Sequence, residues 1–278
     1  MDSIYSSYHH QSKSFQPERL GSYRLRVLVR ENTLLYVVLN SDSKILAVNE
    51  YHSNSPLPFE EFFDGVVKMD YFLKEDYSSV EIVNGTLSFS LIPSKIFVPA
   101  HIKEFAGAMI KEKVGADHLT FRKMDQAEAT AIFSIPHLVK QKCDQHFKAP
   151  EYIPSCQPIM NMADFLAETS GNLLLLTIFK KQFVITGIRN GRLSVCNSYD
   201  YLSATDMVYF TKVVLDLMEL GESTCPIMLQ GDLDLKGDFY KELGGYLPQH
   251  RVPGGLLQDR FETQEGILPY HKYAFLTF

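Results

Sequence analysis

Residues 173–196 read LLLLTIFKKQFVITGIRNGRLSVC, which is three apolar runs separated by two short polar pairs. Each run has the length of a strand, and together the runs are rich in Leu, Val and Ile. The separating pairs, Lys180-Lys181 and Asn190-Gly191, are too short for a crossover helix, and Asn-Gly is a strong hairpin signal. The stretch therefore predicts a three-stranded antiparallel meander.

A helix is expected directly after this meander, from Ser203 to Gly221. The hydroxyl of Ser203 can cap the first turn, with Asp206 three residues on, as in a capping box. Apolar residues then recur at helical spacing, and Gly221 is a typical helix-ending residue. The predicted unit is thus three strands followed by a helix.

The first half of the chain repeats this order of elements. Its three apolar runs are Leu25–Val29, Leu34–Leu39 and Ile45–Val48, and a helical pattern over Phe59–Phe72 follows them. A tyrosine comes just after the third run in each half, Tyr51 in the first and Tyr199 in the second. We interpret the agreement in order and length as an internal duplication.

Strand and helix patterns alternate after each repeated unit. In the first half they are strands at Val80–Val83, Leu87–Ile92 and Ala131–Ile135 and helices at Pro99–Val114 and Pro136–Phe147. In the second half they are a strand at Pro226–Gln230, a helix at Lys236–Leu243 ended by Gly244-Gly245, and a final strand at Tyr273–Phe278. Such alternation predicts that the later strands add in parallel to an α/β sheet.

The length of 278 residues fits two domains of ordinary size. We expect a polar N-terminal arm over residues 1–20, a first domain over 21–150 and a second over 151–278. The boundary is placed at Lys148–Pro154, where two prolines bracket a short segment, and a helix over Pro158–Thr169 is expected to lead into the second domain.

Composition narrows the class of protein. The net charge of -6, with no basic run longer than a pair, disfavours a nucleic-acid partner. No apolar signal segment precedes residue 20, and the apolar runs are too short to span a membrane. The cysteines form no C-x-x-C pair, which favours reduced thiols and a cytoplasmic location. They are Cys143, Cys156, Cys196 and Cys225.

The order of elements resembles duplicated ribonuclease-H-like domains in an actin-like ATPase arrangement, each with a mixed sheet that begins with a three-stranded antiparallel meander. The chain is similar to an uncharacterised bacterial domain-of-unknown-function family (family 3822 type) with this fold. Short phrases such as Phe89-Ser90-Leu91-Ile92-Pro93 and Tyr273-Ala274-Phe275 also carry the resemblance. Because the family has no assigned activity, the resemblance implies a fold and leaves the function open.

The wider actin-like and sugar-kinase group implies where a nucleotide would bind. Its members hold ATP and Mg²⁺ between the halves with an acidic, glycine-rich turn in each first hairpin. Here those turns read Arg30-Glu31-Asn32 and Lys180-Lys181, without Gly or Asp. A third, glycine-containing motif has a partial match at Leu229-Gln230-Gly231-Asp232.

These turns lead to two hypotheses. The first is a non-catalytic scaffold with degenerate phosphate-binding turns, a pseudo-ATPase without a cofactor, which acts on an unknown protein partner or on itself. The second is an atypical ATP-binding protein in which Gly231 and Asp232 would face the nucleoside, with Mg²⁺ as the accompanying ion. We expect no catalytic residues under the first hypothesis.

Three other groups of residues resemble functional motifs but also have a structural interpretation. Asp232–Asp238 begins like a calcium loop, but its twelfth position is Leu243 rather than glutamate, so a turn with helix capping is favoured. Cys143 and His146 could supply half of a zinc site, yet no matching pair exists, so an amphipathic helix is favoured. The tyrosines on either side of Asp200 could form an interface or simply pack.

No hydrolytic site is indicated either. The chain has no Gly-x-Ser-x-Gly elbow for a nucleophilic serine. The first strand of each half carries no acid, whereas a nuclease of the ribonuclease-H type needs converging carboxylates for its metals. We therefore expect no metal site.

Overall fold

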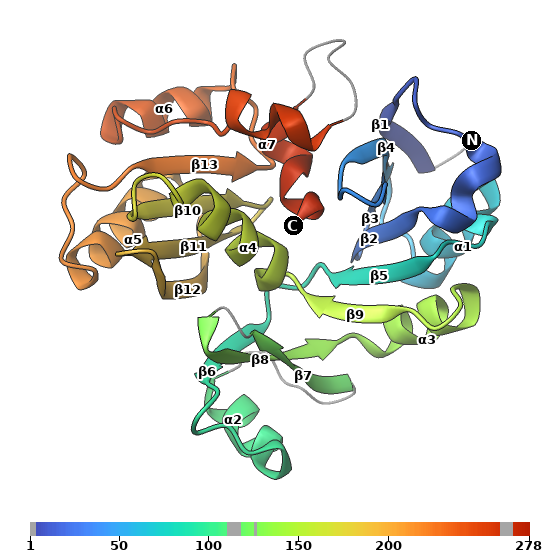
Figure 1. Cartoon of the computed structure of the whole chain (residues 1–278), viewed down its shortest axis with the longest axis horizontal. Helices are drawn as coiled ribbons and strands as arrows, with labels where there is room; N and C mark the ends of the chain where they lie inside the picture. Colours follow the sequence, from blue (N-terminus) through green and yellow to red (C-terminus); the bar gives the residue numbers. More distant parts are fainter. Residues whose placement is uncertain (1–3, 110–117, 125–126, 262–268) are drawn as a thin grey trace.

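A computed structural model describes residues 4–109, 118–124, 127–261 and 269–278 and arranges their strands in three sheets (Figure 1). The largest sheet lies in the first half of the chain and has the spatial order β1 (Ile4–Gln11), β4 (Ile45–Ser53), β3 (Thr33–Leu39), β2 (Arg24–Arg30), β5 (Ser79–Asn84) and β9 (Glu151–Pro154). The second half has the order β12 (Arg192–Asp200), β11 (Gln182–Arg189), β10 (Leu173–Ile178) and β13 (Ile227–Gly231).

Both large sheets contain the predicted meander followed by a parallel strand. In the first, β2, β3 and β4 pair antiparallel, and β5 then pairs with β2 in parallel. In the second, β10, β11 and β12 pair antiparallel, and β13 pairs with β10 in parallel. The mixed α/β fold class is confirmed, and the two sheets share one strand order, whereas an origin by duplication stays a prediction.

The helices cover these sheets with their apolar faces. In the first half they are α1 (Phe59–Met69) and α3 (His137–His146), and in the second half α5 (Ala204–Leu217) and α6 (Asp238–Tyr246). The start of α5 is the predicted capping box, because the Ser203 hydroxyl accepts from the Asp206 amide while the Asp206 carboxylate accepts from the Ser203 amide. No helix among the described residues is long and apolar enough to cross a bilayer.

A third, separately hydrogen-bonded sheet lies beside β9 of the first sheet and shares its core (Figure 1). Its order is β6 (Phe89–Pro93), β8 (Ala129–Ile135) and β7 (His118–Met124), all antiparallel, and α2 (Ile102–Met109) packs on it. The expectation that Ala131–Ile135 adds in parallel to the main sheet is therefore wrong. The helix predicted over Pro99–Val114 is confirmed as a short 3-10 turn plus α2, and its end lies outside the described residues.

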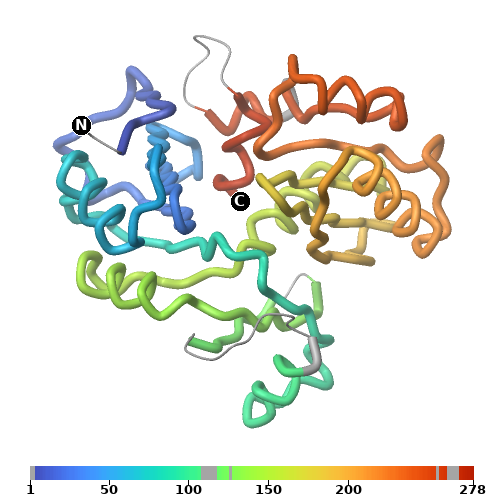
Figure 2. The backbone as a smooth tube through the Cα atoms, turned by 180° about the vertical axis from the view of Figure 1, so that it is seen from behind, coloured from blue at the N-terminus to red at the C-terminus, as the bar shows by residue number. Residues whose placement is uncertain are grey.

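Each half places one helical segment against the other half. Helix α4 (Cys156–Ala167) follows the first sheet and packs on β10, β11 and β12. The C-terminal segment, α7 (Tyr270–Tyr273) and the 3-10 helix Ala274–Thr277, returns to the first sheet, where Arg26 Nη1 donates to the Leu276 carbonyl. Both views place the C-terminus between the two halves (Figures 1 and 2).

Two expectations about secondary structure fail in this architecture. Residues 273–278 are helical and not the expected final strand, and α6 runs through Gly244-Gly245 instead of ending there. The expected linker contains β9, which pairs with β5 in parallel, and the expected polar arm contains β1, which pairs with β4. In the second half, Arg251 forms an isolated parallel bridge to Met228 of β13. The domain boundaries stay a prediction.

The polar arm is held by a buried network in the first half. The Asp70 carboxylate is 5% exposed and accepts hydrogen bonds from the Tyr36 and Tyr51 hydroxyls at 2.6 and 2.8 Å. Asn49 donates to the same cluster and bonds to His9 of β1. Burial raises the pKa of both tyrosines, and Asp70 adds to the effect. The His9 side chain thus ties β1 to this network.

Candidate functional site

The two hairpin turns that would hold phosphates belong to β2–β3 and β10–β11. Arg30 ends β2, and its guanidinium lies 4.2 Å from the ring centre of Phe179, the residue directly after β10 in the other half. This cation–π contact joins the two halves directly. The two turns therefore lack the glycine and aspartate of the wider group, and the large cationic side chain of Arg30 lies between them.

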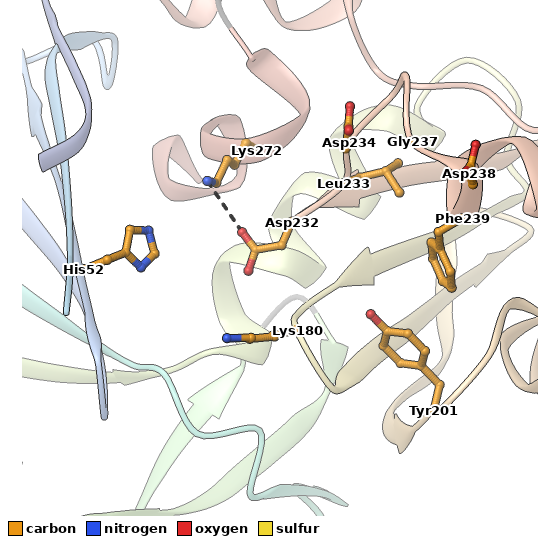
Figure 3. A pocket seen from close by; sticks show the side chains of 10 residues that line it. All are labelled: His52, Lys180, Tyr201, Asp232, Leu233, Asp234, Gly237, Asp238, Phe239 and Lys272. Carbon is orange, nitrogen blue, oxygen red and sulfur yellow. Dashed lines mark ion pairs between the residues drawn. The ribbon is translucent and has the colours of Figure 1, made fainter. Parts of the chain in front are cut away.

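The Asp232 carboxylate forms ion pairs with two cations beside these turns. Its Oδ2 lies 3.3 Å from Nη1 of Arg30, and its Oδ1 lies 3.8 Å from Nζ of Lys272 on α7 (Figure 3). Burial lowers the pKa of Arg30, while the Asp232 charge acts in the opposite direction. An arginine remains protonated near neutral pH, so the pair is ionic.

Lys272 also binds a second, more deeply buried carboxylate. Glu50 of β4 is 3% exposed, and its Oε2 lies 2.8 Å from Lys272 Nζ and 3.0 Å from the Tyr273 hydroxyl. His52 Nε2 lies 3.3 Å from the other oxygen. Burial alone raises the pKa of Glu50, but the hydrogen bonds and the lysine charge outweigh it and lower the pKa to about 2.

We call this group the cleft network, defined as Arg30, Glu50, Asp232 and Lys272. Two of its members come from the first sheet, one follows β13, and one lies on the C-terminal segment. The space among them measures about 10 Å³, near the minimum for one water molecule. The network thus fills the floor between the halves with side chains of the chain itself.

Gly231 has a backbone reason to be glycine. Its φ is +99°, and a Cβ there would lie 2.1 Å from the Ile178 carbonyl oxygen. Gly85 occupies the corresponding place after β5, where a Cβ would lie 2.2 Å from the Val29 carbonyl oxygen. In both sheets the backbone at the end of the parallel strand, β5 or β13, passes too close to the neighbouring strand, β2 or β10, to leave room for a side chain. The two predicted cofactor-binding residues, Gly231 and Asp232, therefore lie together at the cleft floor, but each already has an internal contact.

A larger pocket opens beside the network, with a volume of about 640 Å³ (Figure 3). Lys180 and His52 come from the strand ends, and Tyr201 and Phe239 form one wall with ring centres 5.6 Å apart. The remaining lining residues are Asp232, Leu233, Asp234, Gly237, Asp238 and Lys272. Its volume is within the range of small-molecule sites. Tyr201 therefore packs against Phe239 and also lines this pocket.

The other candidate groupings have local partners. In the Asp232–Asp238 loop, Asp234 Oδ1 accepts the Lys236 amide and closes a turn, which supports the turn interpretation. Burial raises the pKa of the Cys143 thiol to about 12, and His146 bonds to the Leu73 carbonyl. Among the described residues there is no group of three or more His, Cys, Asp or Glu side chains that could hold a metal ion.

Sequence reasoning missed Glu50 and Lys272, and it treated Arg30 only as a missing glycine. A signal existed for one of them: Glu50 is the single acid of β4 and comes two residues after the apolar run that ends at Val48, and a buried acid needs a partner. Lys272 gave no such signal, because the residues that follow it, Tyr273–Phe278, were expected to form a strand, whereas Lys272 lies on helix α7.

Comparisons with known proteins agree on the fold. A Bacteroides thetaiotaomicron protein with an actin-like ATPase fold and unknown function superposes with a TM-score of 0.75 at 15% identity, over 84% of this chain and 92% of that one. PilM, from the PilM-PilN type IV pilus biogenesis complex, superposes with a TM-score of 0.58 at 11% identity, over 91% of this chain and 96% of that one. The fold is thus the actin-like ATPase fold.

No curated protein matches the sequence at a significant level. A protein family, described as "Protein of unknown function (DUF3822)", matches residues 12–249, which is most of the chain. This match confirms the resemblance seen in the order of elements. The chain belongs to the DUF3822 family of proteins of unknown function.

Proposed function

We propose that this chain is a non-catalytic, actin-like interaction protein whose cleft floor is closed by its own side chains. The observation that carries the proposal is the cleft network, which joins the two halves where the wider fold group holds phosphates and metal. Arg30 lies against Phe179 and pairs with Asp232, so a cation of the chain stands between the two hairpins.

The state of Asp232 further supports this proposal. A magnesium ion prefers carboxylate oxygens and usually keeps several waters in an octahedral shell. The Asp232 oxygens already face Arg30 and Lys272, and the adjoining space is about 10 Å³. An ATP–Mg²⁺ complex bound here would have to separate both ion pairs. These residues do not fit that group as they stand.

A binding role for the whole molecule is compatible with the fold. PilM shares the architecture and was solved in a complex with PilN. An actin-like fold can therefore serve as a partner of another protein. A protein that only binds a partner needs no catalytic residues in the cleft. The cleft network would then serve only to hold the two halves in one arrangement.

The alternative function is binding of ATP with unfamiliar ligands, and the 640 Å³ pocket favours it. Tyr201 and Phe239 offer an aromatic wall for a base. Lys180 is exposed and lines the same pocket, so its ammonium could meet a phosphate. Under this alternative Asp232 would contact the ligand from the floor of the pocket.

Titration calorimetry with Mg-ATP separates the two functions. The proposal predicts no binding heat at millimolar nucleotide. Binding that is lost in Lys180→Ala and retained in Lys181→Ala would overturn it, because the two lysines are adjacent and exposed but only Lys180 lines the pocket. Gly231→Leu is unsuitable as a test, since the steric conflict with Ile178 disturbs the fold with or without nucleotide.

A further inference from the structure

Helix α5 carries an unpartnered apolar stripe on its solvent side. Tyr209, Val213 and Leu217 are 62%, 37% and 75% exposed, and Leu202, just before the helix, is fully exposed at 100%. The opposite face of α5 packs into the core of the second half through residues such as Met207 and Val214. Single exposed apolar residues are ordinary, but a row of four along one helix is typical of an interaction surface.

The stripe follows from the helical repeat. Successive residues advance by roughly 100°, so a step of four residues drifts by only about 40°. Tyr209, Val213 and Leu217 are four apart and therefore share one face. We call this row, with Leu202, the α5 stripe.

Lys212 and Asp216 border the stripe on one side, while Asp206, one turn before Tyr209 on the same face, accepts hydrogen bonds from the Leu202 and Ser203 amides. Lys212 directly precedes Val213, and Asp216 directly precedes Leu217, so both lie on the same flank of the helix. Lys212 is 55% exposed and lies 3.7 Å from Glu222, a solvent-exposed contact of little energetic weight. Asp216 is exposed and makes no side-chain ion pair with another described residue.

This arrangement is complementary to itself. In an antiparallel pair of α5 helices related by a two-fold axis level with Val214, midway between Lys212 and Asp216, Tyr209 of one copy lies within about 3 Å, along the helix axis, of Leu217 of the other. The charged flanks then face each other, because an antiparallel pair brings like flanks together. Lys212 of each copy lies near Asp216 of the other, so the pairing contains two symmetric attractive contacts.

We propose that the α5 stripe binds a second copy of this chain, forming a two-fold symmetric dimer. The self-complementary charges favour this occupant over an unrelated helix, which would have to present the opposite pattern by coincidence. The inference rests on the proposed interaction role and names the partner. The stripe does not line the cleft pocket, so dimerisation leaves that pocket open.

Sedimentation equilibrium of the full chain at low salt tests the dimer, using Lys212→Asp and Asp216→Lys. Each single reversal converts two attractive contacts into two repulsive ones, and we expect each to weaken self-association at least tenfold. A mixture of the two variants restores attraction at both contacts and should associate like the parent. This recovery distinguishes charge pairing from a damaged fold, because both variants must be folded to bind each other.

Leu217→Ser is the apolar counterpart, and it should also weaken the dimer at least tenfold without lowering the melting temperature, since the side chain is 75% exposed. A parent chain that stays monomeric at every concentration overturns the proposal, as does a mixture that fails to recover association. Nucleotide binding, which tests the proposed function, is measured separately, so the two can fail independently.

Discussion

Glu50→Gln is the substitution that best measures the strength of the cleft network. The pKa of Glu50 is lowered from 4.5 to about 2 by its contacts with His52, Lys272 and Tyr273, which more than offset burial. At about 1.4 kcal/mol per unit, this shift corresponds to roughly 3 kcal/mol of stabilisation of the folded state by the ionised carboxylate. A glutamine of similar shape keeps the packing and loses the charge.

The expected loss is measurable by thermal unfolding. With an unfolding entropy of roughly 2 cal/mol/K per residue, a chain of 278 residues changes by about 0.6 kcal/mol per degree. A loss of roughly 3 kcal/mol therefore lowers Tm at pH 7 by about 5 °C. Glu219→Gln removes a carboxylate that is 76% exposed and paired with Arg189, and it should change Tm by less than about 1 °C.

The pH dependence gives an independent readout. Because the pKa of Glu50 is lowered on folding, its stabilisation is complete above 4.5 and is lost as the pH falls toward 2. Glu50→Gln should therefore flatten the stability profile within that window. The reasoning is refuted if Glu50→Gln melts within about 1 °C of the parent at pH 7 and the two acid profiles coincide.

Four further substitutions test the structure by melting temperature. Gly231→Ala should lower Tm by several degrees even without ligand, because a Cβ there meets the Ile178 backbone. Gly245→Ala is the control: the residue lies inside α6 with no atom within 4 Å of its Cβ position, so alanine should raise stability by about 0.5–1 kcal/mol. Equal effects of the two variants would contradict the backbone argument. Ser203→Ala should cost about 1 kcal/mol by removing the α5 cap, and an unchanged Tm would count against that cap. Asp70→Ala should cost roughly 3 kcal/mol by leaving two buried tyrosine hydroxyls without their acceptor, and a loss below about 1 kcal/mol would show that the network is not needed.

The meanders could be predicted because local signals and burial agree there. Residues 173–178 are apolar throughout and become a central strand buried on both faces, and the Asn190-Gly191 turn adopts the positive φ values that a tight hairpin requires. The edge strand β1 was missed because it is polar, since one side of an edge strand meets water. Strand β9 is short and flanked by prolines, which is also the signature of a linker.

The C-terminal segment was wrongly predicted because apolar runs of this length are ambiguous. Tyr273–Phe278 is almost continuously buried, and a buried helix cannot be told from a buried strand by periodicity alone. That error hid Lys272, and with it the contact to Glu50. The position of Asp232 was predicted, but its partners come from residues more than 35 positions away in the sequence, which no local pattern specifies.

The central claim is that side chains of the chain itself occupy the place where this fold would hold a nucleotide. The most direct test is the melting temperature with and without about 5 mM Mg-ATP, with ADP and GTP as controls. A nucleotide whose Kd is a tenth of that concentration would raise the free energy of unfolding by about 1.4 kcal/mol, which corresponds to a rise in Tm of about 2 °C for this chain. The account predicts no shift with any nucleotide, and a reproducible rise of that size specific to one nucleotide would contradict it.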